Sequence, residues 1–336
     1  MFININKIIF LNMLFMSTML VISSNSWLSS WMGLEINLLA FIPLMFQKNN
    51  TLNSEFCMKY FIIQALSSSN LFLMIMINFS NQWSHSAASV ITVSLNLTLL
   101  LKLGSSPFHL WFIQIIEGIS WMNVFLFLTW QKIAPFILIM FMMNNKLFSL
   151  MAIINSLTGA IQGFNQTYLR KIISFSSIYN MGWMMSTILI SENLWIFYFL
   201  IYMILTGTLI WTFNLINSNF ISQIFLHNTN KFIMLMLLLN LLSMGGLPPL
   251  LGFVPKWVAL NSLITVSSWM PLILIMTSLI NLFYYIRLMY PHLMLNKFEI
   301  KWFNPPKNTF NKKSNLFYMS LISLLGIPLI SLTNWM

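Results

Sequence analysis

Charged residues are scarce in this sequence, and one kind of acid is missing altogether. Only 6% of the 336 residues are charged, and the five acidic residues are all glutamates. A soluble domain carries about 25% charged residues, because a polar surface has to cover its hydrophobic core. With so few charges that cover cannot form, which excludes a water-soluble globular protein.

Cysteine is almost absent too, since Cys57 is the only one in the sequence. One cysteine excludes a disulfide framework, a cysteine-ligated zinc site and an iron–sulfur cluster held by this chain alone. The sequence also lacks a G-x-G-x-x-G turn, a P-loop and paired histidines at haem spacing. We therefore expect this chain to bind no cofactor and no metal ion.

Hydrophobic residues dominate what is present, at 58% of the chain with a mean hydropathy of +0.81. A membrane-spanning helix needs about 20 apolar residues. The apolar runs predict an all-α polytopic membrane protein, and the first run shows no signal-peptide cleavage site. Its eleven expected spans are 7–24, 27–46, 57–79, 87–119, 122–142, 147–164, 173–191, 193–216, 231–266, 271–290 and 314–333.

Two of these spans are too long for one straight helix and contain helix breakers. Span 87–119 holds Gly104 and Pro107, and span 231–266 holds a Gly-Gly-Leu-Pro-Pro run. Broken backbone at membrane depth is tolerated only inside protein or beside water, so paired breaks indicate a transport site. The breaks fall in the fourth and the ninth span. This spacing predicts an inverted repeat of five helices, 7–142 and 147–290, with a C-terminal helix at 314–333.

Basic residues outnumber acidic ones by 16 to 5, which gives a net charge of +11. Twelve of the basic residues fall in loops on the N-terminal face of the expected topology, and the opposite loops carry only Lys146. This bias is the positive-inside pattern of a membrane protein, so we expect no nucleic-acid partner. It places the N-terminus in the cytoplasm or the mitochondrial matrix, and the C-terminus on the other side.

Four ionisable residues remain inside the spans as candidates for chemistry: Glu35, Lys102, Lys132 and Lys256. Each charge at the bilayer centre costs ~2.5–3.5 kcal/mol, so four approach the whole stability of a protein, about 5–15 kcal/mol. Burial favours the neutral form of both residue types, and a buried Glu–Lys pair can exchange a proton when its surroundings change. The pattern indicates a proton relay. Snorkelling of the lysines from helix ends is the alternative.

Softer candidates lie beside this set. His109 follows the first break and is either a relay group or a hydrogen-bonded core histidine. Ser176 and Asn180 share one face of span 173–191 with Trp183 and Thr187. These polar residues could hold water between relay groups or join neighbouring helices, and the sequence by itself favours the second role.

Four sequence runs, one around each ionisable residue, resemble the subunit 2 family of mitochondrial NADH dehydrogenase, respiratory complex I. They are WMGLEIN at 31–37, LKLGSSPFH at 101–109, WQKIAP at 130–135 and GGLPPLLGFVPKW at 245–257. The composition is most similar to insect members. The family is antiporter-like, and the resemblance implies the metazoan form, which lacks the first three of fourteen bacterial helices.

The resemblance implies a proton-translocating subunit of the mitochondrial inner membrane. It implies that Glu35 pairs with Lys102, that Lys132 links onward and that Lys256 faces a neighbouring subunit. FMN, iron–sulfur clusters and ubiquinone would act in other subunits. Partners would be other membrane-arm subunits, including neighbouring antiporter-like ones, and membrane lipids. The N-terminus would lie in the matrix and the C-terminus in the intermembrane space. A non-conducting scaffold and a stand-alone cation/proton antiporter remain as alternatives.

Overall fold

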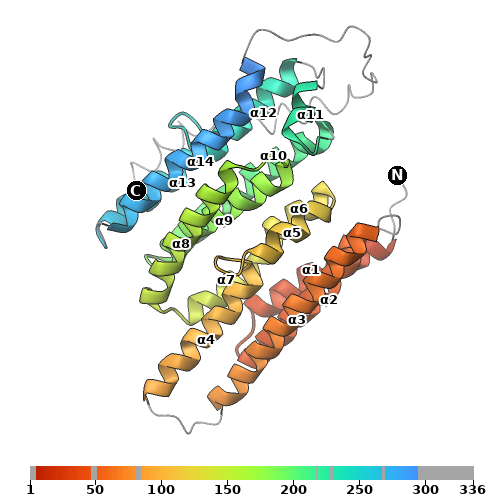
Figure 1. The fold of residues 1–336 in the computed structure, drawn as a ribbon. Coiled ribbons are helices and arrows are strands. Elements are labelled where there is room, and N and C mark those ends of the chain that lie inside the picture. Colours follow the sequence, from red (N-terminus) through yellow and green to blue (C-terminus); the bar gives the residue numbers. More distant parts are fainter. Residues whose placement is uncertain are drawn as a thin grey trace. The chain divides into compact units, whose positions relative to one another are not determined.

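The described part of the chain is helical. The computed structural model describes residues 5–46, 51–79, 85–216, 218–226, 231–266 and 269–293, which form helices with short connections (Figure 1). In these residues, extended pairing is limited to an isolated bridge between Tyr168 and Phe220. The chain divides into two compact units between Phe148 and Ser149. The expectation of an all-α protein is confirmed for these residues.

Unit 1 contains seven complete helices among its described residues. They are α1 (Ile5–Ile22), α2 (Trp27–Met45), α3 (Thr51–Phe79), α4 (His85–Leu103), α5 (Leu110–Gly118), α6 (Trp121–Leu128) and α7 (Trp130–Phe141). Helix α2 packs between α1 and α3, and α3 also contacts α4 and α5. Helix α7 contacts α1, α4 and α6.

Aromatic rings from four helices fill the centre of unit 1. The Phe127 ring centroid lies 5.0 Å from that of Phe112 and 5.8 Å from those of Phe41 and Tyr60. Aromatic pairs at 4.5–7 Å contribute about 0.5–1.5 kcal/mol each beyond the area they bury. This cluster ties α2, α3, α5 and α6 together around the break between α4 and α5.

Unit 2 is built from the remaining helices. They are α8 (Asn145–Phe164, which begins just before the boundary), α9 (Leu169–Ile188), α10 (Glu192–Ile216), α11 (Ile221–Leu226), α12 (Lys231–Gly245), α13 (Phe253–Ile264) and α14 (Trp269–Leu293). Helix α9 contacts α10, α13 and α14, while α10 and α14 each contact α12 and α13. The Asn155 amide donates to the Met185 sulfur and joins α8 to α9 (3.2 Å).

Helix α9 lies at the centre of unit 2. All of its residues except Arg170 and Lys171 are buried. A helix enclosed by others faces little lipid, so its serines, its asparagine and its tyrosine find protein neighbours instead of hydrocarbon. Seven helical segments of the described residues are long and apolar enough to cross a membrane, and α9 is not one of them. Its length suffices, but its polar residues lower its hydropathy, and its enclosed position explains why they are tolerated.

The breaks occur where the sequence predicts them. Span 87–119 is divided into α4 and α5, and span 231–266 into α12 and α13. Span 122–142 differs from the expectation because it is interrupted at Thr129, between α6 and α7. Pro135 in α7 has no amide to bond the Gln131 carbonyl, so the first turn of α7, directly after the interruption, lacks one helical hydrogen bond. The short helix α11 was not expected, and the span predicted at 314–333 lies outside the described residues.

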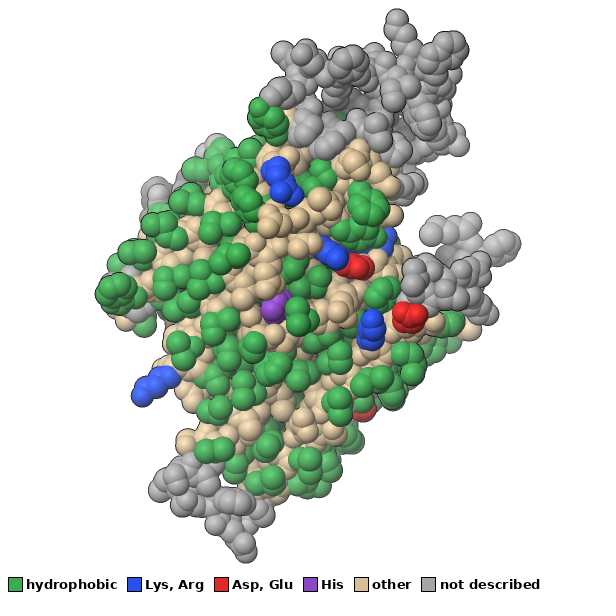
Figure 2. All heavy atoms as spheres, viewed as in Figure 1, with side chains coloured by type: hydrophobic (Ala, Val, Ile, Leu, Met, Phe, Trp, Pro, Cys, Tyr) green, Lys and Arg blue, Asp and Glu red, His purple; other side chains and the backbone are tan. Residues whose placement is uncertain are grey.

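The surface fits a membrane environment. Figure 2 shows a face on which hydrophobic side chains are common and charged ones are few. Large apolar side chains such as Met16, Leu39 and Leu279 are more than half exposed. Seven helical segments in the described part of the chain are long and apolar enough to cross a membrane. The chain is therefore a multi-pass membrane protein.

Candidate functional site

The break between α4 and α5 begins with a helix-ending motif that requires glycine. The Gly104 amide donates to the Leu101 carbonyl (3.1 Å), and the Ser105 amide reaches back to Leu100 (3.2 Å). This is the Schellman arrangement, in which the glycine adopts a left-handed conformation, here φ 67°. A Cβ at Gly104 would lie 2.8 Å from Cβ of Phe112. The turn therefore has no room for a side chain.

Lys102 stands in the last turn of α4, directly before this break. It is 9% exposed, and the Gln64 amide of α3 donates to its backbone carbonyl (3.2 Å). The last carbonyls of a helix carry a partial negative charge, which stabilises a nearby cation by about 0.3–1 kcal/mol. The break therefore places a buried ammonium at a helix end that favours positive charge.

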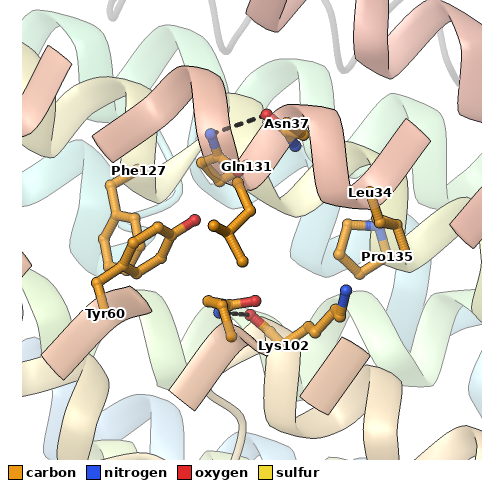
Figure 3. A pocket seen from close by; sticks show the side chains of 9 residues that line it. Leu34, Asn37, Tyr60, Lys102, Phe127, Gln131 and Pro135 are labelled. Carbon is orange, nitrogen blue, oxygen red and sulfur yellow. Dashed lines mark hydrogen bonds between the residues drawn. The ribbon is translucent and has the colours of Figure 1, made fainter. Parts of the chain in front are cut away.

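A small cavity borders Lys102 and has polar walls. It is about 20 Å³ in volume, which is room for one water molecule. The Gln131 amide donates to Asn37 Oδ1 across its edge (3.1 Å), and Figure 3 shows the Lys102 side chain extending toward Pro135. The residues lining this Lys102 cavity are Leu34, Asn37, Leu38, Tyr60, Gln64, Lys102, Phe127, Gln131 and Pro135.

Lys132 lies in the first turn of α7, next to the unexpected interruption. It is 2% exposed, and its Nζ lies 5.3 Å from the centroid of the Phe112 ring. A cation over an aromatic face gains about 0.5–2 kcal/mol, more where water is excluded. Phe112 is also the ring against Gly104. One aromatic side chain thus connects the break after Lys102 with Lys132.

Glu35 completes the charged group in unit 1. Its Oε2 atom is buried and has no hydrogen-bond partner among the described residues. Its carboxylate is close enough to act electrostatically on Lys102. Glu35 and Lys102 are therefore near each other, and Lys132 is linked to the break after Lys102 through the ring of Phe112.

The break in unit 2 repeats the motif of the first one. The Gly246 amide donates to Ser243 (3.0 Å), and the Leu247 amide donates to Leu242 (3.4 Å). Gly246 has φ 83°, and a Cβ there would lie 2.8 Å from the Nζ atom of Lys256. The same backbone geometry thus ends both α4 and α12.

Lys256 stands in the first turn of α13 and reaches back across this break. It is 7% exposed, and its Nζ donates to the Gly245 carbonyl at the end of α12 (3.0 Å). Nζ also lies 5.3 Å from the Tyr179 ring centroid on α9. As with Lys102, a buried ammonium meets the negative end of a broken helix.

Tyr179 lies within a group of buried polar side chains. Its hydroxyl accepts a hydrogen bond from Trp183 Nε1 (2.6 Å), and Asn281 and Tyr285 of α14 are close neighbours. Asn281 is fully buried, and neither polar atom of its side chain has a hydrogen-bond partner in the described residues. The hydroxyls of Tyr284 and Tyr285 are likewise buried without a hydrogen-bond partner in the described residues. Buried polar groups of this kind ordinarily bind ordered water.

The softer candidates have mostly local partners. His109 is 6% exposed, and its Nδ1 lies 3.2 Å from the Pro107 carbonyl inside the first break. Ser176 donates to Ile173 of its own helix (2.8 Å), whereas Asn180 accepts a hydrogen bond from Tyr198 of α10 (3.1 Å). In this structure Asn180 joins two helices, while Ser176 lies close to Tyr285.

Several residues around these lysines were not anticipated from the sequence. Gln64, Gln131 and Asn37 line the Lys102 cavity, and Asn281, Tyr284 and Tyr285 lie near Tyr179. Each is a polar residue inside an apolar run, and Gln131 directly precedes Lys132. An inventory of uncharged polar residues in the spans would have found them.

Comparison with known proteins places this arrangement in a family. The family described as "NADH:quinone oxidoreductase/Mrp antiporter, TM" matches residues 24–281, which include Glu35, Lys102, Lys132 and Lys256. The chain belongs to this family. NADH-ubiquinone oxidoreductase chain 2 of Anopheles gambiae is 43% identical, with 98% of each chain covered. Its Aedes aegypti counterpart is 41% identical, again over 98% of each chain.

The fold of the chain also has counterparts among solved structures. A chain of respiratory complex I from Thermus thermophilus superposes with a TM-score of 0.82 at 19% identity, covering 96% of this chain and 78% of that one. At this identity the likeness concerns the fold. The resemblance identified from the four sequence runs is confirmed by the family match and by the insect relatives.

Proposed function

We propose that this chain is a proton-translocating membrane subunit of the mitochondrial NADH:ubiquinone oxidoreductase complex. The observation that carries the proposal is the placement of three buried lysines beside interruptions in membrane helices. Lys102 and Lys256 each meet the carbonyl end of a broken helix, and Lys132 follows the interruption at Thr129. A static fold has no need of three charges in such positions, each of which costs ~2.5–3.5 kcal/mol.

The proposed relay has one group of residues in each unit. In unit 1, Glu35 and Lys102 exchange a proton, and Lys132 accepts the next one. In unit 2, Lys256 is the titrating group, with His109, Ser176 and Asn180 as supporting residues of the two units. Each transfer breaks one N–H or O–H bond and forms another, so no electron moves in this chain.

Energy for the transfer has to come from elsewhere in the complex. Moving one charge against the membrane potential costs about 2.3 kcal/mol per 100 mV. We propose that electron transfer in other subunits, using FMN, iron–sulfur clusters and ubiquinone, provides it. In this proposal, the chain binds none of these cofactors. It takes part in catalysis only as a subunit of the complex.

The two units support the proposed inverted repeat. In unit 1, α3 contacts α2, α4 and α5, and α4 also contacts α7. In unit 2, α10 contacts α9, α12 and α13, and α12 also contacts α14. The two sets of contacts match when α10 is taken as the counterpart of α3 and α12 as the counterpart of α4. The glycine motif ends the corresponding helices α4 and α12. Five spans in each repeat invert the second relative to the first.

The charge pattern supports the proposed orientation in the inner membrane. We assign the N-terminus to the matrix, because the loops on that face carry twelve of the sixteen basic residues. The proposed partners are neighbouring membrane-arm subunits, including antiporter-like ones, together with lipids against the exposed apolar side chains.

A lysine variant in the assembled complex tests the proposed function. We expect Lys132→Ala, and Lys132→Met with its similar volume, to assemble and to lower the number of protons moved per electron. Lys146→Ala is the matched control, because Lys146 is an exposed lysine in the first turn of α8. An unchanged stoichiometry in assembled Lys132 variants would favour a scaffold. Cation-dependent proton flux by the purified chain alone would favour a free-standing antiporter.

A further inference from the structure

Arg287 of α14 has no acidic neighbour among the described residues of unit 2. It is half-buried, and its Nη2 atom donates to the Gln166 carbonyl in the α8–α9 connection (2.7 Å). Glu192 is the one acid among those residues. It follows the far end of α9, a helix about 30 Å long, whereas Gln166 precedes the near end. An anion that pairs with Arg287 therefore has to come from outside the described part of unit 2.

The position of Arg287 along α14 corresponds to a membrane surface. Trp269 begins this helix and is 79% exposed, and Tyr290 near its end is 55% exposed. At a rise of about 1.5 Å per residue, the two aromatic residues are about 32 Å apart, close to the hydrocarbon thickness of about 30 Å. Tryptophan and tyrosine collect at the two surfaces of a bilayer. Arg287 lies one turn before Tyr290, so its long side chain reaches the level of the lipid phosphates.

Exposed apolar stripes with the same spacing follow α8 and α14. Their residues recur at alternating steps of four and three, and each is between 36% and 60% exposed. The stripe on α8 consists of Leu150, Ile154, Leu157, Ile161 and Phe164. The stripe on α14 consists of Leu272, Met276, Leu279, Phe283 and Ile286. Such steps keep side chains on one face of a helix, so each stripe offers a continuous apolar surface.

The two stripes meet at the end of unit 2 where Arg287 lies. The Phe164 ring stacks on the Phe283 ring, with centroids 5.1 Å apart. Beside them, Gly163 leaves room for the Tyr284 ring, which lies 3.3 Å from the place of a Cβ. Arg287 follows Phe283 by one helical turn. A group bound at Arg287 therefore has an apolar surface of both helices one turn closer to the membrane centre.

An arginine at this level matches a phosphate group. The guanidinium is planar with five N–H donors, and its fork can hold two phosphate oxygens at once. The Gln166 bond uses one of these donors and orients the side chain. A zwitterionic headgroup would add a second cation beside Arg287, with no described acid of unit 2 to receive it. An anionic headgroup avoids that repulsion, as at other basic sites for anionic lipids.

We propose that unit 2 binds an anionic phospholipid, with its phosphate on Arg287 and its acyl chains along the stripes of α8 and α14. The inference rests on the proposed function only for the orientation of the chain, which puts this lipid in the matrix leaflet. It adds a lipid class and a binding position to the general contact between lipids and exposed apolar side chains. The bound lipid connects α8 with α14 at the end where Arg287 already holds the α8–α9 connection.

Photolabelling of the assembled complex in phosphatidylcholine nanodiscs tests the lipid class. One probe is phosphatidylglycerol with a diazirine on an acyl chain, and the other is phosphatidylcholine with the same chain. We expect phosphatidylglycerol to label peptides of α8 and α14 about tenfold more, because it makes a charge-assisted contact without the second cation. Equal labelling by the two probes overturns the proposal. Absence of labelling on both helices also overturns it, because a neighbouring subunit would then cover this face.

Arginine variants test the position of the phosphate. Arg287→Gln retains an amide donor but removes the charge, and we expect it to lower phosphatidylglycerol labelling of α8 and α14 to the phosphatidylcholine level. Arg287→Lys keeps the charge without the fork and should give an intermediate value. Lys59→Gln is the matched control, since Lys59 is an exposed lysine of unit 1 on the same expected membrane face. Full labelling of Arg287→Gln would overturn the assignment of the phosphate.

These tests are separable from the test of the proposed function. Labelling reports lipid binding without any pumping. A normal proton stoichiometry in Lys132→Ala would reject the relay and leave the labelling unchanged, whereas equal labelling by the two lipids would reject this site and leave the Lys132 result unchanged.

Discussion

The Nζ atom of Lys256 donates a 3.0 Å hydrogen bond to the carbonyl of Gly245, across the seven non-helical residues between α12 and α13. The lysine belongs to α13, but its ammonium group is hydrogen-bonded to the last carbonyl of α12. Any change in the protonation of Lys256 therefore alters the contact between the two halves of one broken helix. Lys102, by contrast, lies in α4 itself, the helix that ends at the first break, so it does not join two helices across that break.

Replacement of Lys256 by arginine should separate charge from proton exchange. Arginine keeps a positive charge and remains protonated in proteins, so it can hold the helix end but cannot release a proton. We expect Lys256→Arg to assemble and to lower the proton-to-electron ratio, measured in sealed vesicles. Lys256→Met should lower both assembly and the ratio. Normal pumping by the arginine variant would show that Lys256 is a structural cation.

Gly246→Ala should reduce the amount of assembled complex. A left-handed conformation costs an alanine about 1–2 kcal/mol, and the new Cβ would lie 2.8 Å from Lys256 Nζ. The adjacent Gly245→Ala is the matched control, because its Cβ would meet nothing closer than 3.7 Å. The measurement is the thermal stability of the purified complex, monitored by the loss of this subunit on heating. Equal stability of the two variants would argue against the motif.

Tyr179 offers a pair of variants that divide its ring from its hydroxyl. Tyr179→Phe keeps the ring beneath Lys256 but loses the bond from Trp183, so a buried indole donor is left unpaired at about 1–3 kcal/mol. Tyr179→Leu loses both contacts. We expect turnover with proton pumping to fall in the order wild type, Phe, Leu. The opposite order for the two variants would remove the cation–ring contact from the explanation.

Ordered water should occupy the surroundings of Asn281, Tyr284 and Tyr285. Their polar atoms are buried without partners in the described residues, and such atoms cost about 1–3 kcal/mol unless water binds them. A high-resolution density map of the complete complex is the measurement. Asn281→Leu should remove that density while leaving the helices in place. A dry site in the wild-type map would contradict this expectation.

Local signals explain what the sequence could reveal. Gly104, Gly246 and the neighbouring prolines interrupt helices through their own backbone, so both breaks were predictable from a few adjacent residues. Buried charge has a large cost in a membrane, which singles out Lys102, Lys132 and Lys256 without any knowledge of packing.

Packing explains what the sequence could not reveal. The Lys102 cavity combines Asn37, Gln64 and Gln131 from three helices, and no local pattern indicates that these side chains meet. The interruption at Thr129 was also missed. Pro135, a neighbouring helix breaker, lies inside a helix that continues past it, so the apolar run looks unbroken.

The shortness of α12 and α13 has a consequence for how the protein is made. At 15 and 12 residues, each is about 22 and 18 Å long at a rise of about 1.5 Å per residue, and neither reaches across a hydrocarbon layer of about 30 Å. Their exposed turn cannot rest against lipid. The surrounding helices are α9, α10 and α14, of which α9 and α10 leave the ribosome earlier and α14 leaves it later. Insertion of this segment therefore depends both on helices already delivered to the bilayer and on the helix that follows it, and the order of synthesis becomes part of the folding mechanism.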